Sequence, residues 1–134
     1  EKKVEAGADF AMTQPVYDPE LIERLHEATK HLPIPIFVGI MPFTSGRNAE
    51  YLHNEVPGIT LSDDVRQRMA GLEGEEGRRV SLEISRELID AAMGRFNGIY
   101  LITPFMAYGM TVELTRYAAE RAGRAVPGLS AMGK

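Results

Sequence analysis

The sequence predicts an α/β fold in which parallel strands alternate with helices. Three short apolar segments, residues 10–14, 34–41 and 99–103, are typical of strands, and a proline follows each of them. Stretches with apolar residues at helical spacing separate these segments. Strands that alternate with helices form right-handed βαβ units, and their strands run parallel in one sheet.

Length and composition indicate one globular domain. A chain of 134 residues has the size of an ordinary domain, and 44% hydrophobic with 25% charged residues is typical of soluble proteins. The net charge of -4 and the mixing of acidic and basic residues give no basic face for nucleic acid. No apolar run approaches the roughly 20 residues of a membrane span. The absence of cysteine excludes disulfides, thiol nucleophiles and thiolate metal sites, and suits a cytoplasmic protein.

The first unit begins with the end of a helix. Residues 1–5 are charged helix formers around Val4, and Gly7 is well placed to end a helix. This start, without methionine or an apolar signal core, is expected of a piece of a longer protein. Residues 10–14 are nearly all apolar, which predicts a strand buried on both faces, and Pro15 ends it.

The second unit has clear helix boundaries. Asp18 and Pro19 provide an N-cap acceptor and a proline at the first helical position. The apolar spacing predicts a helix up to Leu32, and two prolines follow. Residues 34–41, rich in branched side chains, then predict a second buried strand.

The rest of the chain contains a third strand and several helices. Helices are expected over residues 47–55, from Ser62 to about Gly71, over 78–93, and from near Thr111. The glycine and glutamate cluster 71–77 predicts a turn, and 99–103 predicts the third buried strand. We expect one domain over residues 1–123 and a flexible tail over residues 124–134.

Candidate binding residues lie where the strands end. Gln14, Met41 and Thr103 each stand just before a proline at the carboxyl end of a strand, where parallel α/β folds bind ligands. Gln14 suits ligand binding, and it equally suits hydrogen bonding to loop backbone groups. Met41 is better explained as a packing residue, and Thr103 is uninformative by itself.

Other polar groups favour structural interpretations. The three histidines, His26, His31 and His53, have no second ligand at metal-binding spacing and are expected to be solvated. The glycine cluster 71–77 lacks the lysine and the serine or threonine of a phosphate loop. Lys3 lies near a helix end, where a cation is favourable in any case.

Three segments carry a family resemblance. Residues 3–14, Lys-Val-Glu-Ala-Gly-Ala-Asp-Phe-Ala-Met-Thr-Gln, resemble the Lys-x-x-Ala-Gly-Ala…Thr-Gln segment of methylenetetrahydrofolate reductases, the flavin enzymes of one-carbon metabolism. Residues 39–42 resemble that family's Gly-Ile-x-Pro strand end. Residues 48–59 are most similar to the bacterial version fused behind a homocysteine methyltransferase domain. The resemblance extends to about Gly123.

The resemblance implies a (β/α)8 TIM barrel of which this chain is the last part, from the end of helix five to helix eight. In that family FAD takes a hydride from NADH or NADPH and passes it to 5,10-methylenetetrahydrofolate, giving 5-methyltetrahydrofolate. By resemblance, Gln14 and Thr103 would contact the folate, and Lys3 and Met41 would contact FAD. The family's catalytic acid lies in earlier strands, so we expect no catalytic residue in this segment and no activity of the piece alone.

Two other interpretations remain open. Three parallel strands leave open edges and an uncovered face, so the chain could act only as a self-associating structural unit, a homo-oligomer held by its sheet edges. Alternatively, it could be an unrelated TIM-barrel domain that binds a ligand.

Overall fold

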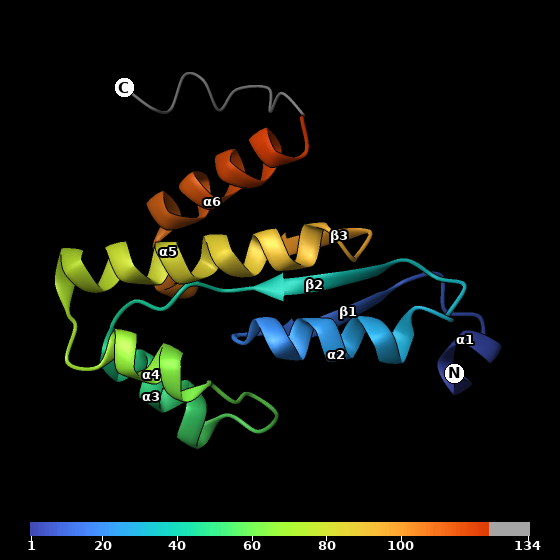
Figure 1. The fold of residues 1–134 in the computed structure, drawn as a ribbon, viewed down its shortest axis with the longest axis horizontal. Coiled ribbons are helices and arrows are strands. Elements are labelled where there is room, and N and C mark those ends of the chain that lie inside the picture. The colour runs from blue at the N-terminus through green and yellow to red at the C-terminus, as the bar shows by residue number, and fades with distance from the viewer. Residues whose placement is uncertain (124–134) are drawn as a thin grey trace.

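The computed structural model describes residues 1–123, which form an α/β fold with a three-stranded parallel sheet (Figure 1). The expected tail, 124–134, lies outside the described residues. The elements in chain order are α1 (Lys2–Glu5), β1 (Ala11–Pro15), α2 (Pro19–Thr29), β2 (Ile36–Ile40), α3 (Gly46–Glu55), α4 (Asp63–Met69), α5 (Gly74–Met93), β3 (Gly98–Leu101), the 3-10 turn η1 (Pro104–Met106) and α6 (Tyr108–Arg121).

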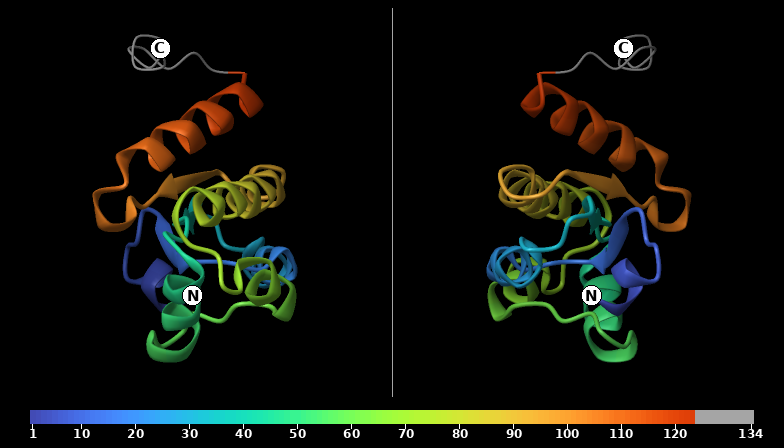
Figure 2. Two further views of the ribbon diagram at one scale, coloured as in Figure 1. Left: turned by 90° about the vertical axis from the view of Figure 1, so that its left-hand side faces the viewer. Right: turned by 90° about the vertical axis from the view of Figure 1, so that its right-hand side faces the viewer.

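The strands follow one another in space as they do in sequence. The order is β1-β2-β3, both pairs are parallel, and β2 lies in the centre. The helices α2 and α5 contact each other and lie on the same side of the sheet (Figure 2). The predicted fold class, with three parallel β/α units, is therefore confirmed.

Side-chain caps fix several helix starts. Asp18 accepts a hydrogen bond from the Glu20 backbone at 2.9 Å, as its N-cap prediction requires. Ser62 accepts one from the Val65 backbone at the start of α4. Because each cap satisfies a backbone N–H that the first helical turn leaves free, α2 and α4 begin where the sequence predicts.

The prediction that all three strands are buried is wrong for two of them. β2 is buried apart from Phe37, whereas β3 is half-buried along its whole length. In β1, exposed and half-buried residues alternate, and Met12 is 54% exposed. β1 and β3 are the edge strands of this sheet, and the face opposite α2 and α5 leaves side chains of β1 accessible.

Several helix boundaries also differ from expectation. The helix α6 begins at Tyr108 rather than near Thr111. The helix α5 begins at Gly74 rather than Arg78, because Glu75 and Glu76 stabilise its first turn and only the segment before Gly74 forms the turn. The helix α2 ends at Thr29, three residues before the expected Leu32.

The core lies between the sheet and its helices. Its largest fully buried side chains include Tyr17, Phe43, Ile22, Ile40, Met69, Ile84, Leu88, Ile89 and Leu114. The buried Ser81 of α5 accepts a hydrogen bond from the Phe43 backbone at 2.6 Å, which holds the loop after β2 against α5. None of the helices in the described part of the chain has the length and hydrophobicity needed to span a membrane.

Candidate functional site

The carboxyl ends of the three strands lie at one end of the sheet, which is called the carboxyl edge below and is distinct from the outer edges of β1 and β3. Gln14 is the next-to-last residue of β1, Met41 follows β2, and Thr103 follows β3. Because the strands are parallel and adjacent, these three residues lie along the same edge, the one toward which the strand arrow of β2 points in Figure 1. The strand order agrees with the predicted position of these residues at the carboxyl ends of the strands.

The side chain of Gln14 is exposed at this edge. Its backbone is fixed, because the Thr13 hydroxyl donates to the Gln14 carbonyl at 2.7 Å and accepts from the Gly39 N–H at 3.0 Å. The Gln14 carboxamide itself makes no hydrogen bond to any of residues 1–123. The alternative that Gln14 serves loop backbone groups is therefore not supported, and its donor and acceptor are free for a ligand.

Tyr100 crosses the sheet next to Gln14. Its hydroxyl donates to the Thr13 carbonyl on β1 from its own place on β3. The ring passes over Gly39 so closely that a Cβ there would lie 2.8 Å from the hydroxyl oxygen. The role of Tyr100 was not predicted, although a glycine inside a buried strand, here Gly39, indicates that another group approaches the backbone closely.

Met41 takes part in packing. Its side chain packs against the hydrophobic core, and its carbonyl accepts a hydrogen bond from the Tyr17 hydroxyl at 2.8 Å. Burial raises the pKa of Tyr17 well above its usual value, so the phenol stays protonated and keeps donating. This geometry agrees with the packing interpretation of Met41.

Thr103 joins the third strand to the last helix. Its hydroxyl shares a 2.8 Å hydrogen bond with the hydroxyl of Thr111 in α6. The segment that follows is strained and exposed, because Phe105 and Met106 adopt φ values of 45° and 59° and are 81% and 74% exposed.

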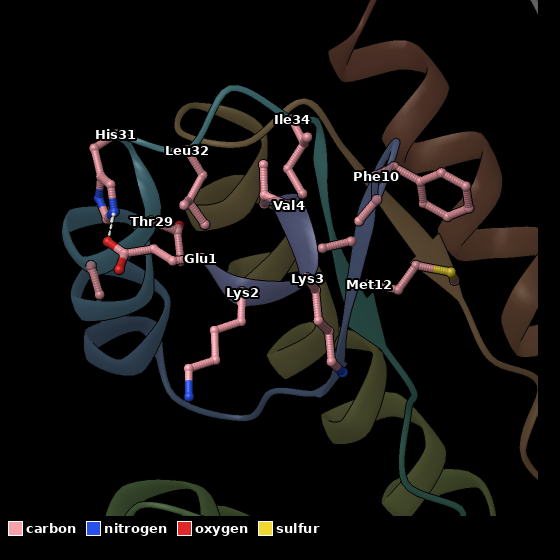
Figure 3. Close-up of a pocket in the computed structure, with 13 residues that line it drawn as sticks. Glu1, Lys2, Lys3, Val4, Phe10, Met12, Thr29, His31, Leu32 and Ile34 are labelled. Atoms are coloured by element: carbon pink, nitrogen blue, oxygen red, sulfur yellow. Dashed lines mark hydrogen bonds and ion pairs between the residues drawn. The ribbon is translucent and has the colours of Figure 1, made fainter. Parts of the chain in front are cut away.

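Lys3 lies away from the other three candidates. The helix α1 is at the amino-terminal end of the strands, opposite the edge that carries Gln14 (Figure 1). There Lys3 lines an open groove of about 810 Å³ together with Phe10, Met12 and Leu32 (Figure 3). Within the described residues, no carboxylate pairs with Lys3. The structure thus brings three of the four predicted residues together, and Lys3 belongs to a separate groove.

Ion pairs on the helices lower the pKa of several carboxyl groups. Four carboxyl groups have pKa values below the usual range, each mainly because a lysine or arginine donates a hydrogen bond: Glu27, Glu50, Glu76 and Glu87. Such groups stay ionised at neutral pH and are poor proton donors. Residues 1–123 also hold no cluster of three or more histidines and carboxylates that would bind a metal ion.

Comparison with known proteins agrees with this geometry. The family model described as methylenetetrahydrofolate reductase matches residues 1–106. The chain is also similar to "Methylenetetrahydrofolate reductase 2" of Schizosaccharomyces pombe, with 27% identity over 114 residues, which cover 76% of this chain and 18% of that protein. The chain spans less than a fifth of the length of this relative. Because the family match covers most of its length, the chain belongs to the methylenetetrahydrofolate reductase family.

Proposed function

We propose that this chain forms the last β/α units of a flavin-dependent methylenetetrahydrofolate reductase. The intact enzyme would reduce 5,10-methylenetetrahydrofolate to 5-methyltetrahydrofolate with NADH or NADPH as the reductant. In this assignment the chain supplies part of the folate site and part of the FAD site, and the groups that transfer protons lie on other strands of the barrel.

The free carboxamide of Gln14 carries this proposal. It lies within the segment matched to the family, at the carboxyl edge of a parallel sheet, and it has no partner among the described residues. The edge of a pterin ring presents donors and acceptors side by side, which a carboxamide can pair with. The Thr103 hydroxyl is engaged with Thr111, so Thr103 would make at most a secondary contact with the folate.

The residues present fit FAD in part. The ammonium group of Lys3, which has no partner among residues 1–123, suits a phosphate oxygen, but Lys3 lies at the end of the sheet opposite Gln14 (Figure 1). Met41 fits less well, since its side chain packs against the core. When bound, FAD would carry the hydride from the nicotinamide to the folate.

The test compares two glutamines in the intact reductase. Gln14→Ala should weaken binding of 5-methyltetrahydrofolate by about 3- to 10-fold, the usual value of one hydrogen bond between neutral groups. Gln67, an exposed residue of α4, provides the matched control, and Gln67→Ala should leave the dissociation constant unchanged. Equal affinity of the Gln14→Ala variant and the unsubstituted enzyme would remove Gln14 from the folate site.

The proposal includes two features of the whole protein. The resemblance of residues 48–59 to the fused bacterial enzymes supports a homocysteine methyltransferase domain upstream. The absence of cysteine suits a cytoplasmic location. Mass spectrometry of the protein isolated from its source would test the first feature, because a fused domain would add its mass to that of the reductase barrel.

A second candidate function is self-association of this chain. It is favoured by the exposed apolar side chains of Phe10 and Met12 and by the unpaired outer edges of β1 and β3. In an intact barrel other strands would cover these surfaces. In their absence, a second copy of the chain would provide the cover.

A further inference from the structure

We infer that Gly58, in the loop between α3 and α4, positions the carboxamide of Gln14 and thereby helps to set the affinity for folate. The inference rests on the proposed function and adds a residue that makes no ligand contact of its own. It starts from the distance between two residues that are 44 positions apart in the sequence (58 minus 14).

Any side chain at position 58 would meet the carboxamide of Gln14. A Cβ atom placed on Gly58 would lie 2.5 Å from the Gln14 Oε1, 3.5 Å from its Cδ and 3.7 Å from its Nε2. Real Cβ atoms do not approach an oxygen so closely, so the glycine leaves just enough room for the amide. The backbone of Gly58 therefore lies beside the exposed carboxamide of Gln14 and bounds one side of the space that the amide occupies.

The backbone at Gly58 is held in place because hydrogen bonds fix the loop around it. The Leu61 N–H donates to the His53 Nδ1 at 3.0 Å, and the Ile59 N–H donates to the Val56 carbonyl at 3.2 Å. Ile59 and Leu61 are also buried. Gly58 itself adopts φ of 84°, a left-handed conformation that favours glycine.

Gln14 has no other restraint at its exposed end. Its backbone is held by Thr13, but its carboxamide has no hydrogen bond to the described residues. Contact with Gly58 thus limits the directions in which the amide can point. A side chain held in its binding orientation loses less rotamer entropy when the ligand arrives, which strengthens binding.

The experiment separates this contact from backbone strain. In the intact reductase, Gly58→Ala adds a methyl group where Gln14 lies. Gly71→Ala is the matched control, because Gly71 also has a left-handed φ, 71°, but a Cβ there would meet nothing within 4 Å. Both variants bear the same kind of strain, and Gly58→Ala alone disturbs Gln14.

Binding of 5-methyltetrahydrofolate and the thermal midpoint are measured for each variant. We expect Gly58→Ala to weaken binding by about fivefold and Gly71→Ala to change it by less than about twofold. In the Gln14→Ala background, adding Gly58→Ala should have no further effect, since the group that it displaces is gone. If Gly58→Ala fails to fold, Gly58→Asn introduces the same Cβ with less strain, because asparagine adopts left-handed angles more readily.

Each result leads to a distinct conclusion. An intact protein that binds no folate would overturn the proposed function. If Gln14→Ala weakens binding but Gly58→Ala binds folate as Gly71→Ala does, the role of Gly58 is wrong. Equal losses from Gly58→Ala with and without Gln14 would also overturn it, because Gly58 would then act independently of Gln14.

Discussion

The hydroxyl of Tyr17 connects two of the loops that form the candidate site. Tyr17 lies between β1 and α2, is 2% exposed, and donates to the Met41 carbonyl in the loop after β2. Its ring stacks on Phe43 with the centroids 4.5 Å apart. This side chain therefore joins the loop after β1 to the loop after β2, next to the strand end that carries Gln14.

Removing this hydroxyl should destabilise the fold without disturbing the ring packing. We expect Tyr17→Phe to lower the free energy of unfolding by about 1–3 kcal/mol, because the Met41 carbonyl loses its partner in a partly buried place. Chemical denaturation of the intact reductase measures the change. Tyr51→Phe, at a site that is 59% exposed, should be neutral, and a similar loss in both variants would contradict this explanation.

The same phenol predicts a pH dependence at alkaline pH. Burial raises the pKa of Tyr17 above the ordinary value of about 10 because the neutral form is favoured in the folded state. The stability that the neutral phenol contributes is complete below about pH 10 and is lost as the pH rises through the folded-state pKa. Stability of the Tyr17→Phe variant should fall less steeply in this range, as urea denaturation at a series of pH values would measure. Parallel curves for the two proteins would contradict the prediction.

For individual residues, the sequence predicted the strand-end positions of the candidate binding residues but not the contacts that their side chains make. The strand-end position of Gln14 followed from one proline and a short apolar run. Whether its amide is free depends on the loop around Gly58, which is remote in sequence. Lys3 was grouped with Gln14 by resemblance, yet the structure places it beside a groove at the opposite end of β1.

Among the elements, α3 lies close against the end of α4 at Gly46. Its N–H donates to the Leu72 carbonyl at 2.7 Å, and a Cβ on it would collide with the carbonyl oxygen of Met69. The start of α3 is thus packed directly on the backbone that follows α4. A glycine is needed there for space, and not for a left-handed conformation.

Substitution of this glycine should loosen the pair of helices. Gly46→Ala should cost about 1–3 kcal/mol or more, because the backbone atoms that it meets cannot rotate away. Gly109 in α6 is the matched control, since a Cβ there meets nothing within 4 Å and alanine is the better helix former by up to about 1 kcal/mol. Thermal unfolding should therefore shift in opposite directions for the two variants. Equal shifts would show that Gly46 is not a packing contact.

Local chemistry predicted the order and type of the elements well. Asp18 and Ser62 cap helices as expected, because a cap depends on a few neighbouring residues. Burial of β1 was not predicted correctly, since it depends on which faces of the sheet other elements cover. An apolar strand at a sheet edge has the same composition as one in the centre.

For the whole molecule, the open sheet face predicts association of the isolated chain. Met12 is exposed in β1, so Met12→Lys should shift the 134-residue chain toward monomer in sedimentation velocity. Tyr51→Lys, an equally exposed position on α3, should leave the distribution unchanged. A chain that is monomeric before any substitution would exclude self-association as its function.

The isolated chain should also fail to reduce flavin. Most contacts that the proposed function requires for FAD would come from other strands, and the groove that Lys2 and Lys3 line is open. Mixing the purified chain with FAD and NADH should therefore leave the flavin absorbance unchanged under anaerobic conditions. Bleaching at a rate above that of free FAD would show that the chain is catalytic by itself.

The strand order has a consequence for how the protein is made. Each strand pairs with the one that precedes it along the chain, β1 with β2 and β2 with β3. A ribosome releases these units in the same order, so each new strand meets an edge that is already in place. Among the described residues, β2 and β3 therefore each meet a strand that is already made, and the sheet can grow by one unit at a time during synthesis.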